Sequence, residues 1–174
     1  MENNISLRAL SRKDIDRTLE WHNQDDIREL YSGHPFPVNI EMEEIWYEKI
    51  LTSNFPTTVF GVETVDEGKL IGITVLKNIN LINREAEFAI YIGDKKQRGK
   101  GFSYLATIST LMFGFHKLGL NRIFLKIIEN NDAAIRLYEK CKFVKEGVLR
   151  KAIFKNNSFH DVIVMSILRE EFER

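Results

Sequence analysis

Apolar residues recur with a period of two along eight short stretches of the chain, which is typical of half-buried strands. The predicted strands cover residues 5–10, 57–64, 69–76, 84–92, 121–129, 143–149, 152–154 and 161–168. The turn Val-Asp-Glu-Gly between the second and third stretches favours a hairpin. Along the fourth stretch, the even-numbered residues face one side of the predicted sheet and the odd-numbered residues face the other.

Four further stretches carry apolar residues with the spacing of helices. Residues 11–14 form a capping-box-like start for the first helix, and Asn39 can cap the second. The third covers residues 102–118 and the fourth covers residues 132–140. This mixture of strands and helices predicts an α+β domain, or an α/β domain with layers of helix and sheet.

The composition fits one globular domain that covers residues 1–174. Hydrophobic residues make up 44% of the chain, and none of their runs approaches the ~20 residues that a membrane span needs. The N-terminus is polar and lacks the apolar core of a signal peptide. The single cysteine, Cys141, has no partner for an internal disulfide. We therefore expect a cytoplasmic protein without a membrane partner.

The net charge is zero, but the charges are unevenly distributed. Residues 94–155 hold 14 Lys and Arg against 5 Asp and Glu, whereas residues 20–48 hold 8 Asp and Glu against one cation. Such runs are often solvated surfaces. The alternative is that the chain has two partners, one polyanionic and one cationic.

The stretch Lys-Gln-Arg-Gly-Lys-Gly-Phe-Ser at residues 96–103 lies between a predicted strand and a predicted helix. Gly99 and Gly101 would let the backbone approach a ligand closely, and the start of a helix offers unpaired amides and positive charge. The spacing differs from that of a P-loop and from the dinucleotide fingerprint. The stretch alone predicts either a phosphate site or an ordinary glycine turn among solvated lysines.

Three stretches together resemble the GNAT family of N-acetyltransferases, in the branch of ribosomal-protein and polyamine (spermidine) acetyltransferases. Arg-Gly-Lys-Gly-Phe-Ser at residues 98–103 is similar to the family's pyrophosphate loop. Residues 130–143 and the Glu-Gly-Val-Leu-Arg of residues 146–150 are similar to its later motifs. Three features depart from the pattern: Ser103 in the loop, one extra residue before it, and Lys142 in place of a glycine.

The resemblance implies a mixed, mostly antiparallel sheet with helices on both faces and splayed central strands. It implies acetyl-CoA as the co-substrate, with the pantetheine arm along residues 88–92 and the slot opened by a split from the strand 121–129. The residues that the resemblance assigns to the coenzyme are Ile90, Tyr91, Ile92, Arg98, Gly99, Lys100, Gly101, Phe102, Ser103, Asn131, Ala133, Ala134, Tyr138 and Lys140.

Acetyl transfer to an amine needs an acid for the leaving thiolate and a route for the amine proton. Tyr138 matches the family tyrosine and is the predicted acid, although its helical spacing also fits a core aromatic. Glu87 is a candidate base, and a chain of waters is the alternative. The four histidines show no ligand spacing, so we expect no metal. Cys141 is more consistent with a structural role than with a nucleophile.

The resemblance places the first two helices over the acceptor site, where acidic and aromatic residues would suit an alkyl-ammonium chain. We expect a diamine or polyamine such as spermidine. Solvated helix faces and core tryptophans are the alternative. The candidate acceptor residues are Trp21, Glu29, Tyr31, Glu41 and Glu44.

Other functions remain open at this point. A protein N-terminus or an amino-sugar nucleotide could replace the polyamine, and a coenzyme A-binding regulatory module would need no turnover. Nucleic-acid binding is disfavoured because the sequence shows no recognised motif for it. A homo-oligomer is left open as a further partner.

Overall fold

The computed structural model describes residues 4–30, 36–52 and 55–174. A seven-stranded sheet runs through it in the order β1-β2-β3-β4-β5-β7-β6, and only the β4–β5 pair is parallel. The strands are β1 (Ile5–Arg8), β2 (Thr58–Thr64), β3 (Lys69–Asn80), β4 (Glu85–Ile92), β5 (Arg122–Ile128), β6 (Val144–Lys155) and β7 (Ser158–Leu168). The predicted mixed, mostly antiparallel sheet is confirmed.

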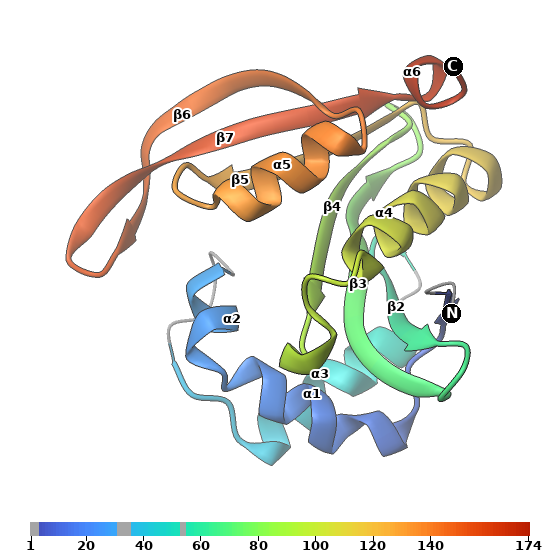
Figure 1. The fold of residues 1–174 in the computed structure, drawn as a ribbon, viewed down its shortest axis with the longest axis vertical. Coiled ribbons are helices and arrows are strands. Elements are labelled where there is room, and N and C mark those ends of the chain that lie inside the picture. The colour runs from blue at the N-terminus through green and yellow to red at the C-terminus, as the bar shows by residue number, and fades with distance from the viewer. Residues whose placement is uncertain (1–3, 31–35, 53–54) are drawn as a thin grey trace.

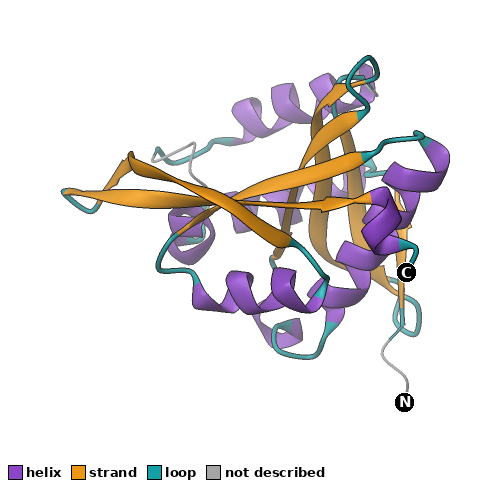
Figure 2. Ribbon diagram, turned by 90° about the horizontal axis from the view of Figure 1, so that it is seen from above, coloured by secondary structure: helices purple, strands orange, loops and turns teal. Residues whose placement is uncertain are grey.

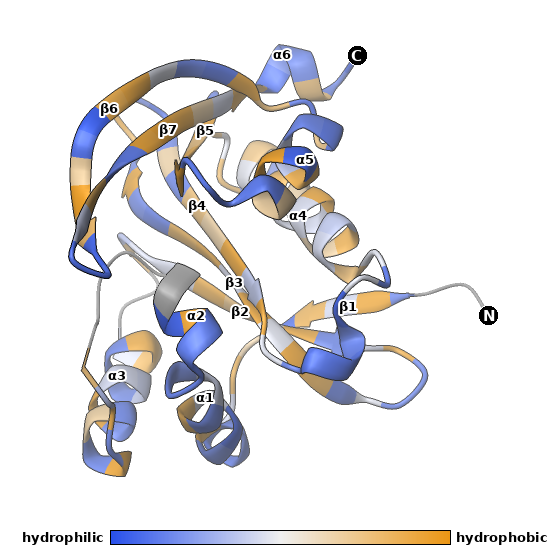
Figure 3. Cartoon of the chain, turned by 60° about the vertical axis from the view of Figure 1, so that its left-hand side comes forward, coloured by the Kyte–Doolittle hydropathy of each residue, from blue (hydrophilic) through white to orange (hydrophobic). Residues whose placement is uncertain are grey.

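Helices cover both faces of this sheet, as predicted (Figures 2 and 3). The α-helices are α1 (Ile15–His22), α2 (Asp25–Leu30), α3 (Ile40–Thr52), α4 (Phe102–Met112), α5 (Asp132–Lys140) and α6 (Arg169–Phe172). Short 3-10 turns occupy η1 (Arg12–Asp14) and η2 (Lys95–Gln97), and a π-helical turn, η3 (Phe113–Lys117), continues α4. Figure 3 shows α1 and α3 on one side of β2–β4, with α4 and α5 on the other.

The alternation of β4 decides which residues enter which core. Phe88 packs with Leu111 and Phe115 under α4. Tyr91 points to the opposite face and packs with Trp21 and the other residues of α1 and α3. Strand β4 therefore separates two cores, and its backbone forms the boundary between them.

The outer part of the C-terminal hairpin of β6 and β7 projects beyond the rest of the sheet (Figure 1), whereas Met165 and Ile167 of β7 belong to the core that contains Phe88. The sequence predicted two strands in place of β6, because the apolar alternation is interrupted between residues 149 and 152. In the structure, a register shift between Leu149 and Ile153 absorbs the interruption, and Lys151 there has a φ of 51°. One bulged strand is the correction.

Two short helices, α2 and α6, were not predicted. The six residues of α2 are too few to show a helical period, and side-chain contacts with a distant loop hold the helix. Asp26 forms ion pairs with Arg98 and Lys95 of the segment between β4 and α4. Tertiary contacts of this kind cannot be predicted from local sequence.

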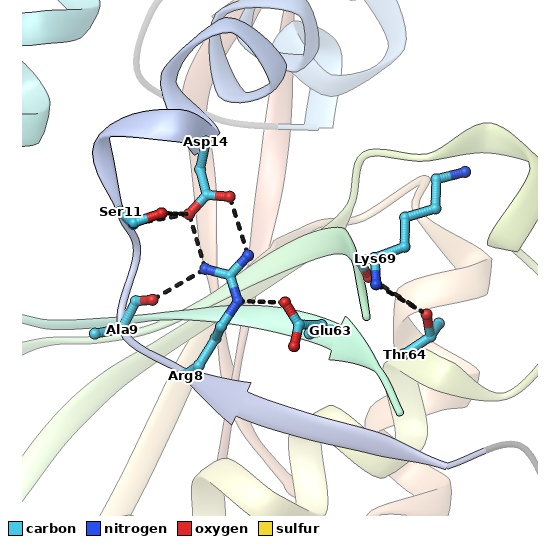
Figure 4. Close-up of polar contacts among 7 residues, drawn as sticks. All are labelled: Arg8, Ala9, Ser11, Asp14, Glu63, Thr64 and Lys69. Atoms are coloured by element: carbon cyan, nitrogen blue, oxygen red, sulfur yellow. Dashed lines mark hydrogen bonds and ion pairs between the residues drawn. The ribbon is translucent and has the colours of Figure 1, made fainter. Parts of the chain in front are cut away.

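The entry into the first helix is fixed by an arginine that two carboxylates share (Figure 4). Arg8 of β1 donates to both oxygens of Asp14, at 2.7 and 3.0 Å, and to Glu63 of β2. Asp14 also accepts from the amide and the hydroxyl of Ser11, which completes the predicted capping box. The network joins β1, β2 and the turn before α1.

Among the residues that the structure describes, no helix is long and apolar enough to span a bilayer.

Candidate functional site

The parallel pair β4–β5 separates after three residues of pairing, and a cleft begins there. The last paired residues are Glu87 and Phe124, and beyond them the two strands share no described backbone pairing. The resulting cleft has a volume of about 340 Å³. It is lined by Ile27, Lys77, Glu87, Phe88, Ala89, Ile90, Tyr91, Ile92, Arg98, Gly99, Ser103, Lys126, Ile127, Ile128, Asn131, Ala133, Ala134, Leu137 and Tyr138. The predicted splayed slot is therefore present between the two strands named from the sequence.

The glycine loop lies at one end of this cleft and opens α4. Gly99 and Gly101 have φ values of 77° and 85°, which side chains other than glycine rarely adopt. Within the described chain, no backbone carbonyl accepts from the amides of Gly99, Gly101, Phe102 or Ser103. The first bonded amide of the helix is that of Tyr104, which donates to Gly101. The loop therefore presents unpaired backbone donors of the kind that an anionic diphosphate needs.

Arg98 connects the loop to the end of β4 and to α2. Its Nε donates to the carbonyl of Ile92 at 2.8 Å, and its other nitrogens contact Asp26 and Gln24 next to α2. Burial raises the pKa of Asp26, but the hydrogen bond and the charge of Arg98, together with the charge of Lys95, outweigh it, and the net pKa lies below the usual value. Arg98 thus positions the loop and already carries a carboxylate partner, so part of its charge is neutralised before an anion arrives.

The helix α5 forms the opposite wall of the cleft. The side chain of Asn131 accepts from the amide of Ala134 at 3.1 Å and caps the helix. Tyr138 follows on the same helix, is nearly buried, and packs edge-on against Phe88 of β4 with ring centroids 6.1 Å apart. The tyrosine therefore lines the cleft and also belongs to the core, and its role as the acid stays a prediction.

Glu87 lies where β4 and β5 separate. Its carboxylate is 3.1 Å from the ammonium of Lys77 and accepts from the side chain of Asn78 at 3.2 Å. Both partners belong to β3, so the candidate base is held by two donors at the edge of the cleft.

Ten of the residues assigned to the coenzyme line the cleft, and four do not. The four that lie outside its lining are Lys100, Gly101, Phe102 and Lys140. Phe102 is buried under β3 and β4, and Lys140 lies over the ring of Tyr104 at 4.6 Å. Six further lining residues were not assigned from the sequence: Ile27, Lys77, Lys126, Ile127, Ile128 and Leu137.

Three of the five candidate acceptor residues have described side chains, and these three do not line one common cavity. Trp21 is 2% exposed and packs against Gly93, where a Cβ would lie 2.0 Å from its ring, so it is a core residue. Glu41 and Glu44 line a separate hollow on the outer side of α3. Tyr31 lies outside the described residues, as does the side chain of Glu29.

A second cavity of about 460 Å³ lies on the other side of β4, under α1 and α3. It shares Lys77, Ala89 and Tyr91 with the first cleft, so the two hollows meet at β4. Its aromatic wall includes Trp46, and His22 stands beside Tyr91. The sequence did not predict this cavity, because its lining comes from five separate elements.

Two other expectations concern metal and thiol chemistry. Within the described ranges, no cluster of three or more His, Cys, Asp or Glu side chains could hold a metal ion. Burial raises the pKa of the Cys141 thiol to about 11, so the cysteine is protonated at neutral pH. This supports the structural role predicted for Cys141.

Comparison with known proteins agrees with the architecture. The family model described as "Acetyltransferase (GNAT) domain" matches residues 4–144. Spermidine N(1)-acetyltransferase of Vibrio cholerae is 36% identical over 172 residues, which are 99% of this chain and 97% of the relative.

Solved structures of that relative superpose well on this chain. Spermidine N-acetyltransferase from Vibrio cholerae in complex with CoA and spermine has a TM-score of 0.90 at 33% identity, covering 98% of both chains. A dodecameric structure of the enzyme has a TM-score of 0.81 at 34% identity, covering 97% of this chain and 95% of that one. The splayed cleft, the glycine loop and the full-length match lead to one conclusion: this chain belongs to the GNAT family of acetyltransferases.

Proposed function

We propose that this acetyltransferase moves the acetyl group of acetyl-CoA directly to a primary amine of a polyamine such as spermidine. The observation that carries the proposal is the cleft between β4 and β5, which has the glycine loop at one end and Tyr138 in its wall. The names of the Vibrio cholerae relatives support the polyamine as acceptor.

The residues of the cleft divide the work by their chemistry. The amides of Gly99, Gly101, Phe102 and Ser103 would bind the diphosphate. Beyond Glu87, the edge of β4 offers backbone groups to the pantetheine arm, and the amide of Ile90 or Tyr91 would polarise the thioester carbonyl. The phenol of Tyr138 would protonate the leaving thiolate.

The proton of the acceptor amine needs a separate route. Glu87 lines the cleft and is one candidate, with Lys77 and Asn78 holding its carboxylate. A chain of waters is the other. We propose transfer within a ternary complex, without a covalent enzyme intermediate and without a metal ion.

Acidic residues favour a cationic acceptor. Glu41 and Glu44 lie on the outer side of α3, near a hollow that Glu48 and Arg12 also line. We propose that they attract the polyamine rather than hold the reacting nitrogen, since the hollow is separate from the cleft. Neutralising both should raise the KM for spermidine and leave the KM for acetyl-CoA unchanged.

The experiment is a thiol-release assay with acetyl-CoA and a panel of acceptors: spermidine, spermine, an N-terminal peptide and an amino-sugar nucleotide. We expect turnover with the polyamines. Turnover with the peptide alone would reassign the enzyme to protein N-termini, and binding of acetyl-CoA without any turnover would support a regulatory module. Activity that survives a chelator would support transfer without metal.

Two further expectations concern the assembly of the chain and its location in the cell. The relative's dodecameric structure supports a homo-oligomer for this chain, and sedimentation would measure its size. A cytoplasmic location remains a prediction.

A further inference from the structure

We propose that Tyr91, His22 and Glu43 form a proton relay that removes the amine proton on the acceptor side of β4. The inference rests on the proposed function and assigns its missing base. The three residues come from three elements, β4, α1 and α3, and are joined by two hydrogen bonds.

The geometry of the relay is defined by short contacts. The Tyr91 hydroxyl lies 3.1 Å from His22 Nε2, and His22 Nδ1 lies 2.7 Å from Glu43 Oε2. With Glu43 as a carboxylate, Nδ1 must donate to it, so Nε2 is the nitrogen free to accept the phenol proton. This is the same logic by which a carboxylate fixes the tautomer of a catalytic histidine.

Burial explains why the carboxylate would act on the histidine. Glu43 is 1% exposed, and no described residue donates to its second oxygen, Oε1. A buried carboxylate with one donor is poorly compensated while that donor is neutral. Glu43 therefore holds the Nδ1 proton of His22 and orients the ring so that Nε2 faces the Tyr91 hydroxyl.

The relay lies on the acceptor side of β4. Tyr91 is among the residues that line both the cleft between β4 and β5 and the cavity under α1 and α3, and its ring and hydroxyl face the cavity, which His22 also lines. An amine held in this cavity would share it with the side chains of Trp46, His22 and Tyr91. The side chain of His22 is 23% exposed, so a proton that arrives there can leave to solvent.

The proposed steps account for every proton of the reaction. An ammonium group loses two protons when it becomes an amide. One passes to the Tyr91 oxygen as the phenol proton moves to Nε2 of His22, and from there it leaves to solvent. The nitrogen lone pair then forms the C–N bond, the C–S bond breaks, and Tyr138 protonates the sulphur. The second proton of the nitrogen replaces the one that Tyr138 has given.

Glu87 has a different environment from this relay. It stands two positions from Ala89 on the same face of β4, and Lys77 and Asn78 already occupy its carboxylate. The described charged or titratable groups that face the His22 side of the cavity are Glu43 and Lys49 of α3, Tyr91 of β4 and Lys77 of β3. Among them, histidine is the side chain whose charge ordinarily changes between pH 5 and 8.

The test is the pH profile of kcat/KM for spermidine in the full-length chain, with Tyr91→Phe, His22→Gln and Glu43→Gln. Loss of general-base assistance should lower kcat/KM about 100-fold in Tyr91→Phe, while the KM for acetyl-CoA changes less than about twofold. Each group that must lose a proton adds one unit of slope to log kcat/KM at low pH. We therefore expect His22→Gln to reduce that slope by one unit.

A matched control separates the relay from packing. Tyr47→Phe removes a hydroxyl from the same buried cluster, but Tyr47 lines neither cavity, so its kinetics should equal those of the native chain. If Tyr91→Phe does not fold, the slope of His22→Gln decides alone, since His22 is partly exposed. Unchanged slopes with normal native turnover overturn the relay and leave the acetyltransferase standing. No turnover of any amine by the native chain overturns both.

Discussion

Replacing Gly101 with alanine tests the glycine loop with little steric disturbance. A Cβ at this position would meet no heavy atom within 4 Å, so the variant adds no clash. The φ of 85° is the obstacle, because alanine in a left-handed conformation costs about 1–2 kcal/mol. The loop should relieve this cost by rotating, and the amides of residues 101–103 would then turn away from the diphosphate site.

The expected loss of affinity follows from the hydrogen bonds between the loop amides and the diphosphate that would be lost. A hydrogen bond to a charged group contributes about 1.5–3 kcal/mol. Loss of one such bond should weaken acetyl-CoA binding by about 10- to 150-fold, since each 1.4 kcal/mol is a factor of ten. The assay is a calorimetric titration with coenzyme A, paired with thermal unfolding.

Gly119→Ala is the matched control. Gly119 has a φ of 66°, and a Cβ added there would also meet no heavy atom within 4 Å, but the residue follows η3 at the far end of α4. Both variants should lose similar stability, and only Gly101→Ala should lose affinity. Equal affinities in the two variants would refute the phosphate role of the loop.

Two further predictions concern stability and reactivity. Arg8→Gln should lower the free energy of unfolding at pH 7 by about 1.5–3 kcal/mol, by removing hydrogen bonds to Asp14. Burial raises the pKa of Asp14, but the Arg8 and Ser11 bonds outweigh it, so the net pKa is lowered. The stabilisation is therefore present above about pH 4 and is lost as the pH falls further. Denaturant titrations should show that the stability of the variant depends less on acid pH, and an identical dependence would contradict the assignment. Cys141 should resist a thiol reagent in the native state and react after unfolding, because its thiol is buried; rapid labelling of the native chain would contradict this.

The donor side of the site could be predicted from the sequence because its signals are local. Gly99 and Gly101 stand close together in the chain, between a period-two strand and an apolar helix, and Asn131 precedes the helix that it caps. Each needs only neighbouring residues to be interpreted. The structure then adds Ile127 and Ile128 to the lining, whose apolar side chains gave no separate functional signal.

The acceptor side could not be predicted in this way because it depends on distant contacts. His22 and Tyr91 are 69 residues apart, and neither shows a motif. Charge counting pointed to the acidic helices as a whole, but it could not separate Glu43, which faces the core, from Glu44, which faces outward. A run of charges gives the composition of a helix, whereas packing decides which of its side chains reaches the site.

Hydrogen–deuterium exchange with and without coenzyme A tests the central claim most directly. We predict that saturating coenzyme slows exchange in peptides covering residues 88–103 and 131–138, with little change in the hairpin at residues 144–168. Protection confined to other segments, or no protection at all, would contradict a coenzyme site in the cleft between β4 and β5.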